Sequence, residues 1–114
     1  MQTQIENLLA DIKTDYINWS TSNGTKEISS YSQGQIDAFD DNVEVKHGKK
    51  YIKIVGGVSS GVWGFIVATD DHPKFKKGDI LKAAGYNAPA MNAARGNILD
   101  GGYTVRWTGP LYLN

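Results

Sequence analysis

The first apolar residues of the chain recur at helical spacing. They are Ile5, Leu8, Leu9, Ile12, Tyr16 and Trp19, separated by steps of 3, 1, 3, 4 and 3 residues. Because that spacing puts them on one stripe, we predict a helix over residues 3–19. Thr3 and Glu6 have the spacing of a capping box at its start. Turn-forming residues in the segment 20–24 indicate its end.

Residues 30–42 carry an ambiguous helical pattern. Ser32 is a candidate N-cap for a second helix, and Ile36 and Phe39 would then lie on its inner face. Gly34 weakens this interpretation because glycine disfavours helix interiors.

From Val43 the apolar pattern changes to that of strands. The apolar residues on either side of His47-Gly48-Lys49 predict a β-hairpin. A glycine-rich segment, 56–61, is expected to be a flexible connection to a strong strand over 62–68. Turns are predicted at 70–73 and 77–79, and the second leads into a strand over 80–83.

The C-terminal third is predicted to hold one more helix and one more strand. Four alanines and Met91 within residues 88–94 indicate a short helix with Pro89 in its first turn, ending near Gly96. Residues 103–107 predict a closing strand, which Gly109-Pro110 would terminate. The expected fold class is α+β: N-terminal helices packed on a small, mainly antiparallel sheet, with the short helix in the C-terminal part. Residues 1–114 are expected to form a single domain.

Composition excludes some classes of protein. The 114 residues include no cysteine, so disulfides and thiolate metal sites are excluded and a reducing, cytoplasmic setting is favoured. No long apolar run or secretion-type N-terminus is present, which argues against a membrane span. The net charge of +0 argues against a protein that coats bulk nucleic acid.

Catalytic and metal-binding motifs are not recognisable in the sequence. His47 and His72 are isolated and lack metal-ligand spacing, so surface histidines are the better interpretation. Serine-hydrolase, Walker A and dinucleotide-binding motifs do not occur. The adjacent pairs Asp40-Asp41 and Asp70-Asp71 are expected to be solvated surface charges. We therefore predict a protein that is not an enzyme, with neither a metal nor a cofactor.

Charge is divided unequally along the chain. Residues 72–114 carry six cations and two acids, a local charge of +4, whereas residues 1–71 carry six lysines and ten acids, giving −4. The cationic part also holds aromatic rings and carboxamides, which suit the phosphates, base and ribose of a nucleotide. The candidate ligand-binding residues are Phe75, Tyr86, Asn92, Arg95, Asn97 and Arg106. Each has a structural alternative: the rings as core, and Arg95-Gly96-Asn97 as a helix C-cap.

The segment 78–84, followed by Ala88-Pro89-Ala90, Asn92 and residues 94–97, resembles the Thoeris anti-defence family of phage-encoded nucleotide-signal sponges. The resemblance covers roughly residues 49–113. It implies a small α+β domain that assembles into a homo-oligomer, a dimer or hexamer, in the cytoplasm of an infected bacterium. It also implies sequestration, without cleavage, of a small cyclic nucleotide of the cyclic ADP-ribose type, with cyclic oligonucleotides at a second site in some members.

The same resemblance implies ligand contacts from Asn92, Arg95 and Arg106 together with Phe75 or Tyr86. A tryptophan would be a stronger stacking platform than Tyr86. Two other functions are compatible with the sequence. One is a phage structural or interaction protein without a small-molecule ligand, in which the rings and arginines form subunit contacts. The other is a nucleic-acid-binding accessory protein, whose binding would weaken steeply with salt.

Overall fold

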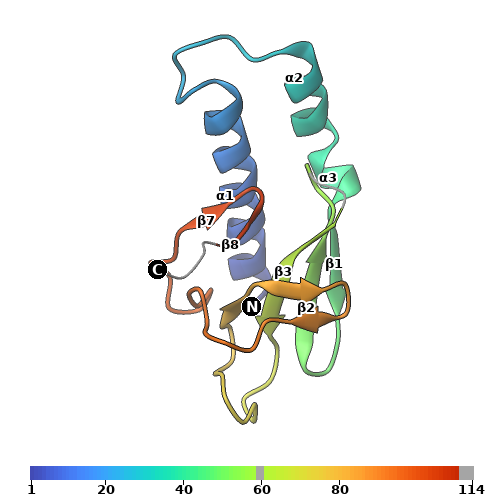
Figure 1. Ribbon diagram of the computed structural model, residues 1–114, viewed down its shortest axis with the longest axis vertical. Helices are drawn as coiled ribbons and strands as arrows, with labels where there is room; N and C mark the ends of the chain where they lie inside the picture. Colours follow the sequence, from blue (N-terminus) through green and yellow to red (C-terminus); the bar gives the residue numbers. More distant parts are fainter. Residues whose placement is uncertain (59–60, 111–114) are drawn as a thin grey trace.

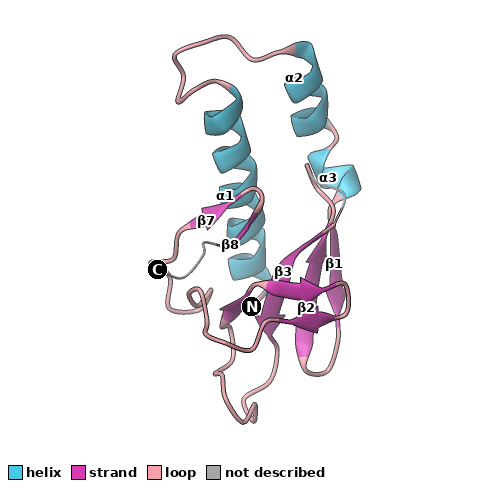
Figure 2. Ribbon diagram, in the orientation of Figure 1, coloured by secondary structure: helices cyan, strands magenta, loops and turns pink. Residues whose placement is uncertain are grey.

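A computed structural model describes residues 1–58 and 61–110 of the chain. The helices all precede the strands along the sequence (Figure 2). The elements are α1 (Gln2–Ser20), α2 (Ser30–Asp37), α3 (Phe39–Asn42), β1 (Glu44–His47), β2 (Tyr51–Val55), β3 (Val62–Val67), β4 (Ile80–Leu81), β5 (Ala83–Gly85), β6 (Ala88–Pro89), β7 (Val105–Arg106) and β8 (Gly109–Pro110). Strands β1 to β4 form an antiparallel sheet in sequence order, while β5–β6 and β7–β8 are separate two-stranded hairpins. The predicted α+β class is confirmed.

Helix α1 follows its predicted stripe over most of its length. Ile5, Leu8, Ile12 and Tyr16 are buried, the first three against isoleucines of the sheet. The predicted capping box is wrong, because the helix already begins at Gln2, with Met1 as a cap that makes no side-chain hydrogen bond. The last member of the stripe, Trp19, is 61% exposed, because the end of α1 extends beyond the sheet (Figure 1).

The segment after α1 is helical but broken. Helix α2 is capped by Ser29, whose side chain accepts a hydrogen bond from the backbone N–H of Ser32, the residue predicted to be the cap. Ser32 is instead buried inside the helix, 3.4 Å from the Tyr16 hydroxyl. Ile36 and Phe39 are buried as expected, and the helical path is interrupted at Ala38 between α2 and α3.

The predicted β1–β2 hairpin and the strand β3 are confirmed. The connection predicted at 56–61 includes residues 59 and 60, which lie outside the described residues. Gly64 in β3 allows close packing, because a Cβ there would lie 2.9 Å from the Leu81 carbonyl oxygen and 3.2 Å from the Pro110 ring. This contact seats the β7–β8 hairpin on the sheet.

The helix predicted over residues 88–96 is wrong. Residues 83–89 form the β5–β6 hairpin instead, with Tyr86 and Asn87 at its turn. Beyond it, the backbone N–H groups of Ala90 and Arg95 donate to the carbonyls of Lys82 and Ile80, both at 2.7 Å. A helix would forfeit these bonds, and the helix preference of alanine, a few tenths of a kcal/mol over ordinary residues, is too small to offset them.

The predicted closing strand is shorter than expected. Only Val105–Arg106 pairs as β7, and the chain turns at Trp107 and Thr108. Gly109-Pro110, expected to terminate the strand, forms the second arm of the hairpin as β8. Proline is compatible with this position because a two-stranded hairpin leaves half of its N–H positions without a ladder partner.

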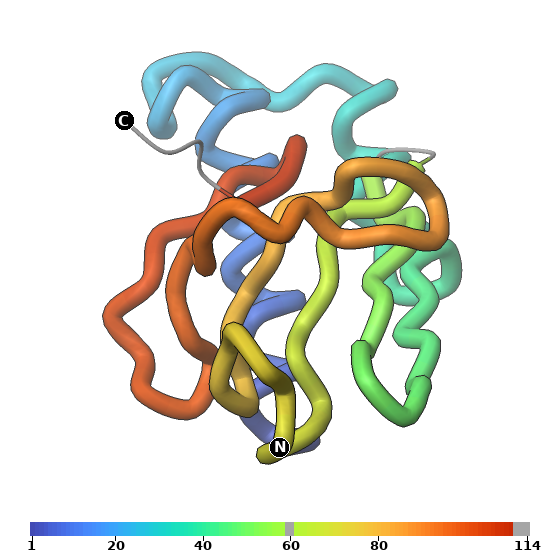
Figure 3. Tube along the Cα trace, turned by 60° about the horizontal axis from the view of Figure 1, so that its bottom comes forward, coloured from blue at the N-terminus to red at the C-terminus, as the bar shows by residue number. Residues whose placement is uncertain are grey.

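The two faces of the sheet pack against different parts of the chain. Ile52, Ile54, Ile66 and Ile80 lie in a cluster with α1. Phe65, Val67 and Leu81 form a second cluster with Phe75, against which Tyr51, Ala83 and Ala94 pack. Figure 3 shows the β5–β6 hairpin, in orange, lying across the strands of the sheet on this second side. The alternation of side chains along a strand therefore separates the core under α1 from a second buried cluster on the other face.

Candidate functional site

Several hollows in the described part of the molecule combine an aromatic ring with polar groups, and two of them hold a cluster of lysines or a pair of indoles. The lysine pocket, with a volume of ≈ 350 Å³, is lined by Lys46, His47, Gly48, Lys50, Tyr51, Lys53, Phe65 and Asn87. The aromatic cleft, with a volume of ≈ 530 Å³, is lined by Asp15, Asn18, Trp19, Ser22, Asn23, Arg106, Trp107 and Thr108. Both volumes fall in the usual range for small-molecule sites.

The lysine pocket lies along one row of the sheet. Lys46 on β1 is the cross-strand partner of Lys53 on β2, which in turn faces Phe65 on β3. Cross-strand partners project from the same face, so the two ammonium groups are carried side by side. Like charges at directly opposed positions destabilise a sheet. The repulsion between Lys46 and Lys53 must therefore be offset by hydrogen bonds or opposite charges nearby.

The tip of the β5–β6 hairpin supplies part of that compensation. The Lys53 Nζ donates to the Tyr86 carbonyl at 3.1 Å and to the Asn87 Oδ1 at 2.9 Å, and it lies 3.9 Å from the centre of the Tyr86 ring. The Tyr86 hydroxyl accepts a 3.5 Å hydrogen bond from Lys46 Nζ. This bond and the Glu44 carboxylate, 3.6 Å away, raise the pKa of Lys46, which keeps it charged.

The floor of the lysine pocket is held rigidly. Tyr51 packs edge-on against Phe65, with ring centres 6.0 Å apart, and its hydroxyl lies 2.9 Å from the Nε2 of His72. The His72 Nδ1 accepts the backbone N–H groups of Lys74 and Phe75, so its proton resides on Nε2 and is donated to the tyrosine oxygen. Burial raises the pKa of Tyr51, which keeps the phenol neutral.

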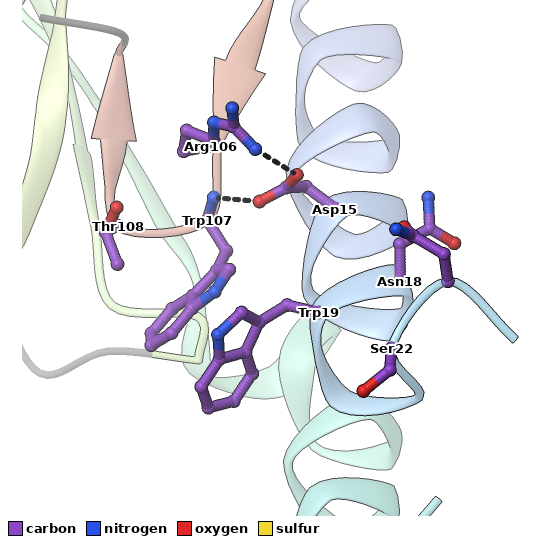
Figure 4. A pocket seen from close by; sticks show the side chains of 8 residues that line it. Asp15, Asn18, Trp19, Ser22, Arg106, Trp107 and Thr108 are labelled. Atoms are coloured by element: carbon purple, nitrogen blue, oxygen red, sulfur yellow. Dashed lines mark hydrogen bonds and ion pairs between the residues drawn. The ribbon is translucent and has the colours of Figure 1, made fainter. Parts of the chain in front are cut away.

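The aromatic cleft is built where the end of α1 meets the β7–β8 hairpin (Figure 4). One oxygen of Asp15 accepts the backbone N–H of Trp107 at 2.8 Å, and the other lies 3.9 Å from Arg106 Nη1. The centre of the Trp107 ring is 5.1 Å from Tyr16, edge to face, and 5.1 Å from Trp19, at a tilt of 52°. Asp15 thus holds the hairpin against α1, and the two tilted indoles contact each other beside it.

The rim of the aromatic cleft is polar and partly strained. Ser22 and Asn23 have φ values of 49° and 60°, a left-handed conformation that side chains other than glycine seldom adopt. Within the described residues, the side chains of Asn18, Ser22, Asn23 and Thr108 make no intramolecular hydrogen bond. Their donors and acceptors are therefore directed to solvent or to a ligand.

Two of the predicted site residues lie in the interior. Phe75 is 8% exposed and belongs to the second apolar cluster. Asn97 is 7% exposed: its Nδ2 donates to the Lys77 carbonyl and to Asp79 Oδ1, both at 2.9 Å. Its Oδ1 accepts the backbone N–H groups of Leu99 and Asp100. Phe75 is a core ring, as its structural alternative expected. Asn97 also serves the fold, but as the centre of a turn and not as the expected helix C-cap, because no helix ends there.

The other four predicted residues lie in three places. Tyr86, 53% exposed, stands at the edge of the lysine pocket, and Arg106 lines the aromatic cleft. Asn92 and Arg95 are neighbours, since Arg95 Nη2 donates to Asn92 Oδ1 at 3.4 Å. The structure therefore brings Asn92 and Arg95 together, but it gives Tyr86 and Arg106 different surroundings.

Apart from Arg106, sequence reasoning missed the residues that define the two hollows. Lys46, Lys50 and Lys53 belong to the acidic half of the chain, where a search for local positive charge does not find them. The predicted hairpin brings its two arms together but fixes no register, and only the structure pairs Lys46 with Lys53. The helical stripe predicts Trp19 to be a core residue, and no motif in the sequence indicates a function for Asp15 on the same helix.

Comparison with known proteins gives no match to a family model, a curated protein or a solved structure. Function is therefore inferred from the geometry of the two hollows. Among the described residues, no group of three or more His, Asp or Glu side chains is placed to hold a metal ion. No helix in residues 1–58 or 61–110 has the length and apolarity needed to cross a bilayer.

Proposed function

We propose that the protein binds a small anionic ligand with a flat ring, of the nucleotide class, in the lysine pocket and releases it unchanged. The observation that carries this proposal is the opposed pair Lys46 and Lys53. A phosphate bound between the two ammonium groups would relieve their repulsion, so binding and sheet stability would be coupled.

The lining of the pocket agrees with an anion. It contains three lysines and no carboxylate among its described lining residues, and Glu44 lies outside it beside Lys46. Lys53 uses two of its three N–H groups on the hairpin tip, which leaves one for a ligand. The exposed ring of Tyr86 and the carboxamide of Asn87 stand next to these cations, where they can meet a base and its polar edge.

The resemblance to Thoeris anti-defence sponges names a specific candidate. We therefore propose sequestration of cyclic ADP-ribose-type signals as the biological role, in the cytoplasm of an infected bacterium. The pocket sits at the surface, and a second copy of the chain placed over it would enclose the ligand more fully. The expected dimer or hexamer is thus part of the same proposal.

The test is calorimetric titration of the full chain with cyclic ADP-ribose isomers, ADP-ribose and inorganic phosphate. The double variant Lys46→Gln/Lys53→Gln should weaken nucleotide binding at least about a hundredfold, because each of the two lost charge-assisted contacts contributes about 1.5–3 kcal/mol. The matched control is Lys26→Gln/Lys76→Gln, which removes the same number of charges from two exposed lysines outside the pocket. It should bind like the parent protein.

Mass spectrometry of the ligand recovered after heat denaturation completes the test. Intact ligand is expected. Recovery of a hydrolysed product would show that the protein cleaves the ligand, and an enzymatic function would replace the proposed binding function. A parent protein that binds none of the nucleotides yet still forms an oligomer would favour the structural or interaction protein instead.

A further inference from the structure

One of the two indoles in the aromatic cleft is largely exposed, which leaves part of its surface available to a ligand. Trp19 is 61% exposed at the end of α1, although it touches both Tyr16 and Trp107. Trp107 is half-buried and is held by Tyr16, which meets it edge to face with ring centres 5.1 Å apart. One ring is therefore fixed by the fold, and it supports a second ring that is presented to solvent.

The arrangement of the two indoles limits what they can bind. A planar base sandwiched between two rings needs them parallel and separated by two contact distances of about 3.5 Å each. Here the ring centres are 5.1 Å apart and the planes are tilted by 52°, so no such slot exists. The exposed part of Trp19 instead offers one open aromatic surface. Aromatic faces carry negative charge density and attract the weakly positive C–H groups of a sugar ring.

The charge of the aromatic cleft points to a neutral ligand. Its two ionised side chains are Asp15 and Arg106, which are paired at 3.9 Å. Around the indoles stand two carboxamides and two hydroxyls, from Asn18, Asn23, Ser22 and Thr108, that have no intramolecular hydrogen bond in the described structure. Carboxamides and hydroxyls both donate and accept, as the hydroxyl groups of a sugar do.

We propose that the aromatic cleft is a second binding site, which takes a neutral saccharide with a pyranose ring packed on Trp19. Its volume of ≈ 530 Å³ accommodates one or two sugar rings. Asp15 acts as a positioning residue, since its hydrogen bond to the Trp107 backbone joins the hairpin to the helix. The site is independent of the lysine pocket, with which it shares no lining residue.

The experiment is NMR titration of the full chain with the methyl pyranosides of glucose, mannose and N-acetylglucosamine, and with methyl riboside and adenosine in separate arms. The chain has three tryptophans, so its indole N–H signals report directly on the site. The indole signals of Trp19 and Trp107 should shift with at least one pyranoside, with a Kd of about 1–10 mM for a ligand of this size. The buried Trp63, which donates to the Arg106 carbonyl at 2.8 Å, should shift least.

Two variants separate the proposal from nonspecific effects. Trp19→Ala should weaken pyranoside binding at least about tenfold, as removal of an aromatic anchor does. Tyr31→Ala removes a comparable ring, 73% exposed on α2, and should leave binding unchanged. Asn18→Ala, which keeps both indoles, should give a smaller loss. Lys46→Gln/Lys53→Gln should bind the pyranoside normally, so failure of the nucleotide proposal would not affect this one.

Three results would overturn the assignment. The first is the lack of any indole shift at about 50 mM pyranoside, well above the expected Kd. The second is undiminished binding by the Trp19→Ala variant. The third is tighter binding of adenosine or methyl riboside than of every pyranoside, which would make the cleft a platform for a base or ribose.

Discussion

The lysine pocket, of ≈ 350 Å³, and the larger aromatic cleft, of ≈ 530 Å³, are built in different ways. In the lysine pocket, Lys46 and Lys53 lie on strands β1 and β2, and the backbone pairing of the strands fixes the positions of their Cα atoms. The aromatic cleft joins the end of a helix to a short hairpin, and its rings support each other. Attraction in the first is electrostatic and acts at a distance, whereas the second depends on contact. The comparison teaches that the fold combines rings with charge in different proportions, with three lysines beside Tyr51 and Phe65 in the first hollow and two indoles beside one ion pair in the second.

The largest effect should come from the fixed ring of the aromatic cleft. Trp107→Ala should lower the free energy of unfolding by about 3 kcal/mol, because the ring is half-buried between Tyr16 and Trp19. Trp19→Ala should cost less than about 1 kcal/mol, since most of that side chain is in water. Urea denaturation of both variants measures the difference. Equal losses would mean that the two indoles form one packing unit and that neither is free for a ligand.

Salt should then distinguish the two hollows. The screening length falls from about 10 Å at 0.1 M to about 3 Å at 1 M salt. Nucleotide binding in the lysine pocket should weaken about tenfold over this range, which corresponds to about 1.4 kcal/mol. Pyranoside binding in the aromatic cleft should stay constant, because the charges of Asp15 and Arg106 compensate each other. Parallel titrations at both salt concentrations test this, and an equal salt response would remove the distinction between the sites.

The predictable parts of the molecule are those decided by neighbouring residues. The α1 stripe and the β1–β2 hairpin follow from apolar periodicity, and both were predicted with nearly correct bounds. The prediction for the segment 88–96 is wrong because its backbone forms hydrogen bonds with residues far away in the sequence. One example is the Ile80 carbonyl, which accepts a hydrogen bond from the backbone N–H of Arg95. Local alanine content carries no information about such bonds.

The candidate site was harder to predict for the same reason. Trp19 and Trp107 meet only after the β7–β8 hairpin has packed on α1, and Lys53 meets Tyr86 only after the β5–β6 hairpin has folded over the sheet. Asn97 has the chemistry of a ligand contact, yet the turn residues around it use all of its hydrogen-bonding groups. Residue type indicates what a side chain can do, but tertiary neighbours decide which of those groups remain available.

The smallest expected effect is a change in how the unfolding free energy depends on alkaline pH. It involves two tyrosines, Tyr51 at the lysine pocket and Tyr103 near the β7–β8 hairpin. Burial raises the pKa of Tyr51 on the floor of the lysine pocket. Burial, assisted by Asp11 on α1, raises the pKa of Tyr103 just before β7. A raised folded-state pKa means that the unfolded chain releases its proton first. Each tyrosine therefore stabilises the fold fully below about pH 10, and that contribution is lost as the pH rises through the folded-state value.

Unfolding free energies measured between pH 8 and pH 11 should thus fall less steeply in Tyr51→Phe and Tyr103→Phe than in the parent protein. The slope is the decisive quantity, because Tyr51→Phe also loses the hydrogen bond to His72, which lowers stability at every pH. Exposed Tyr31→Phe provides the control and should reproduce the parent slope. If the unfolding free energy of the Tyr51→Phe variant falls with pH as steeply as that of the parent protein, the Tyr51 phenol of the parent is solvated. The floor of the lysine pocket would then be open rather than fixed by His72 and Phe65.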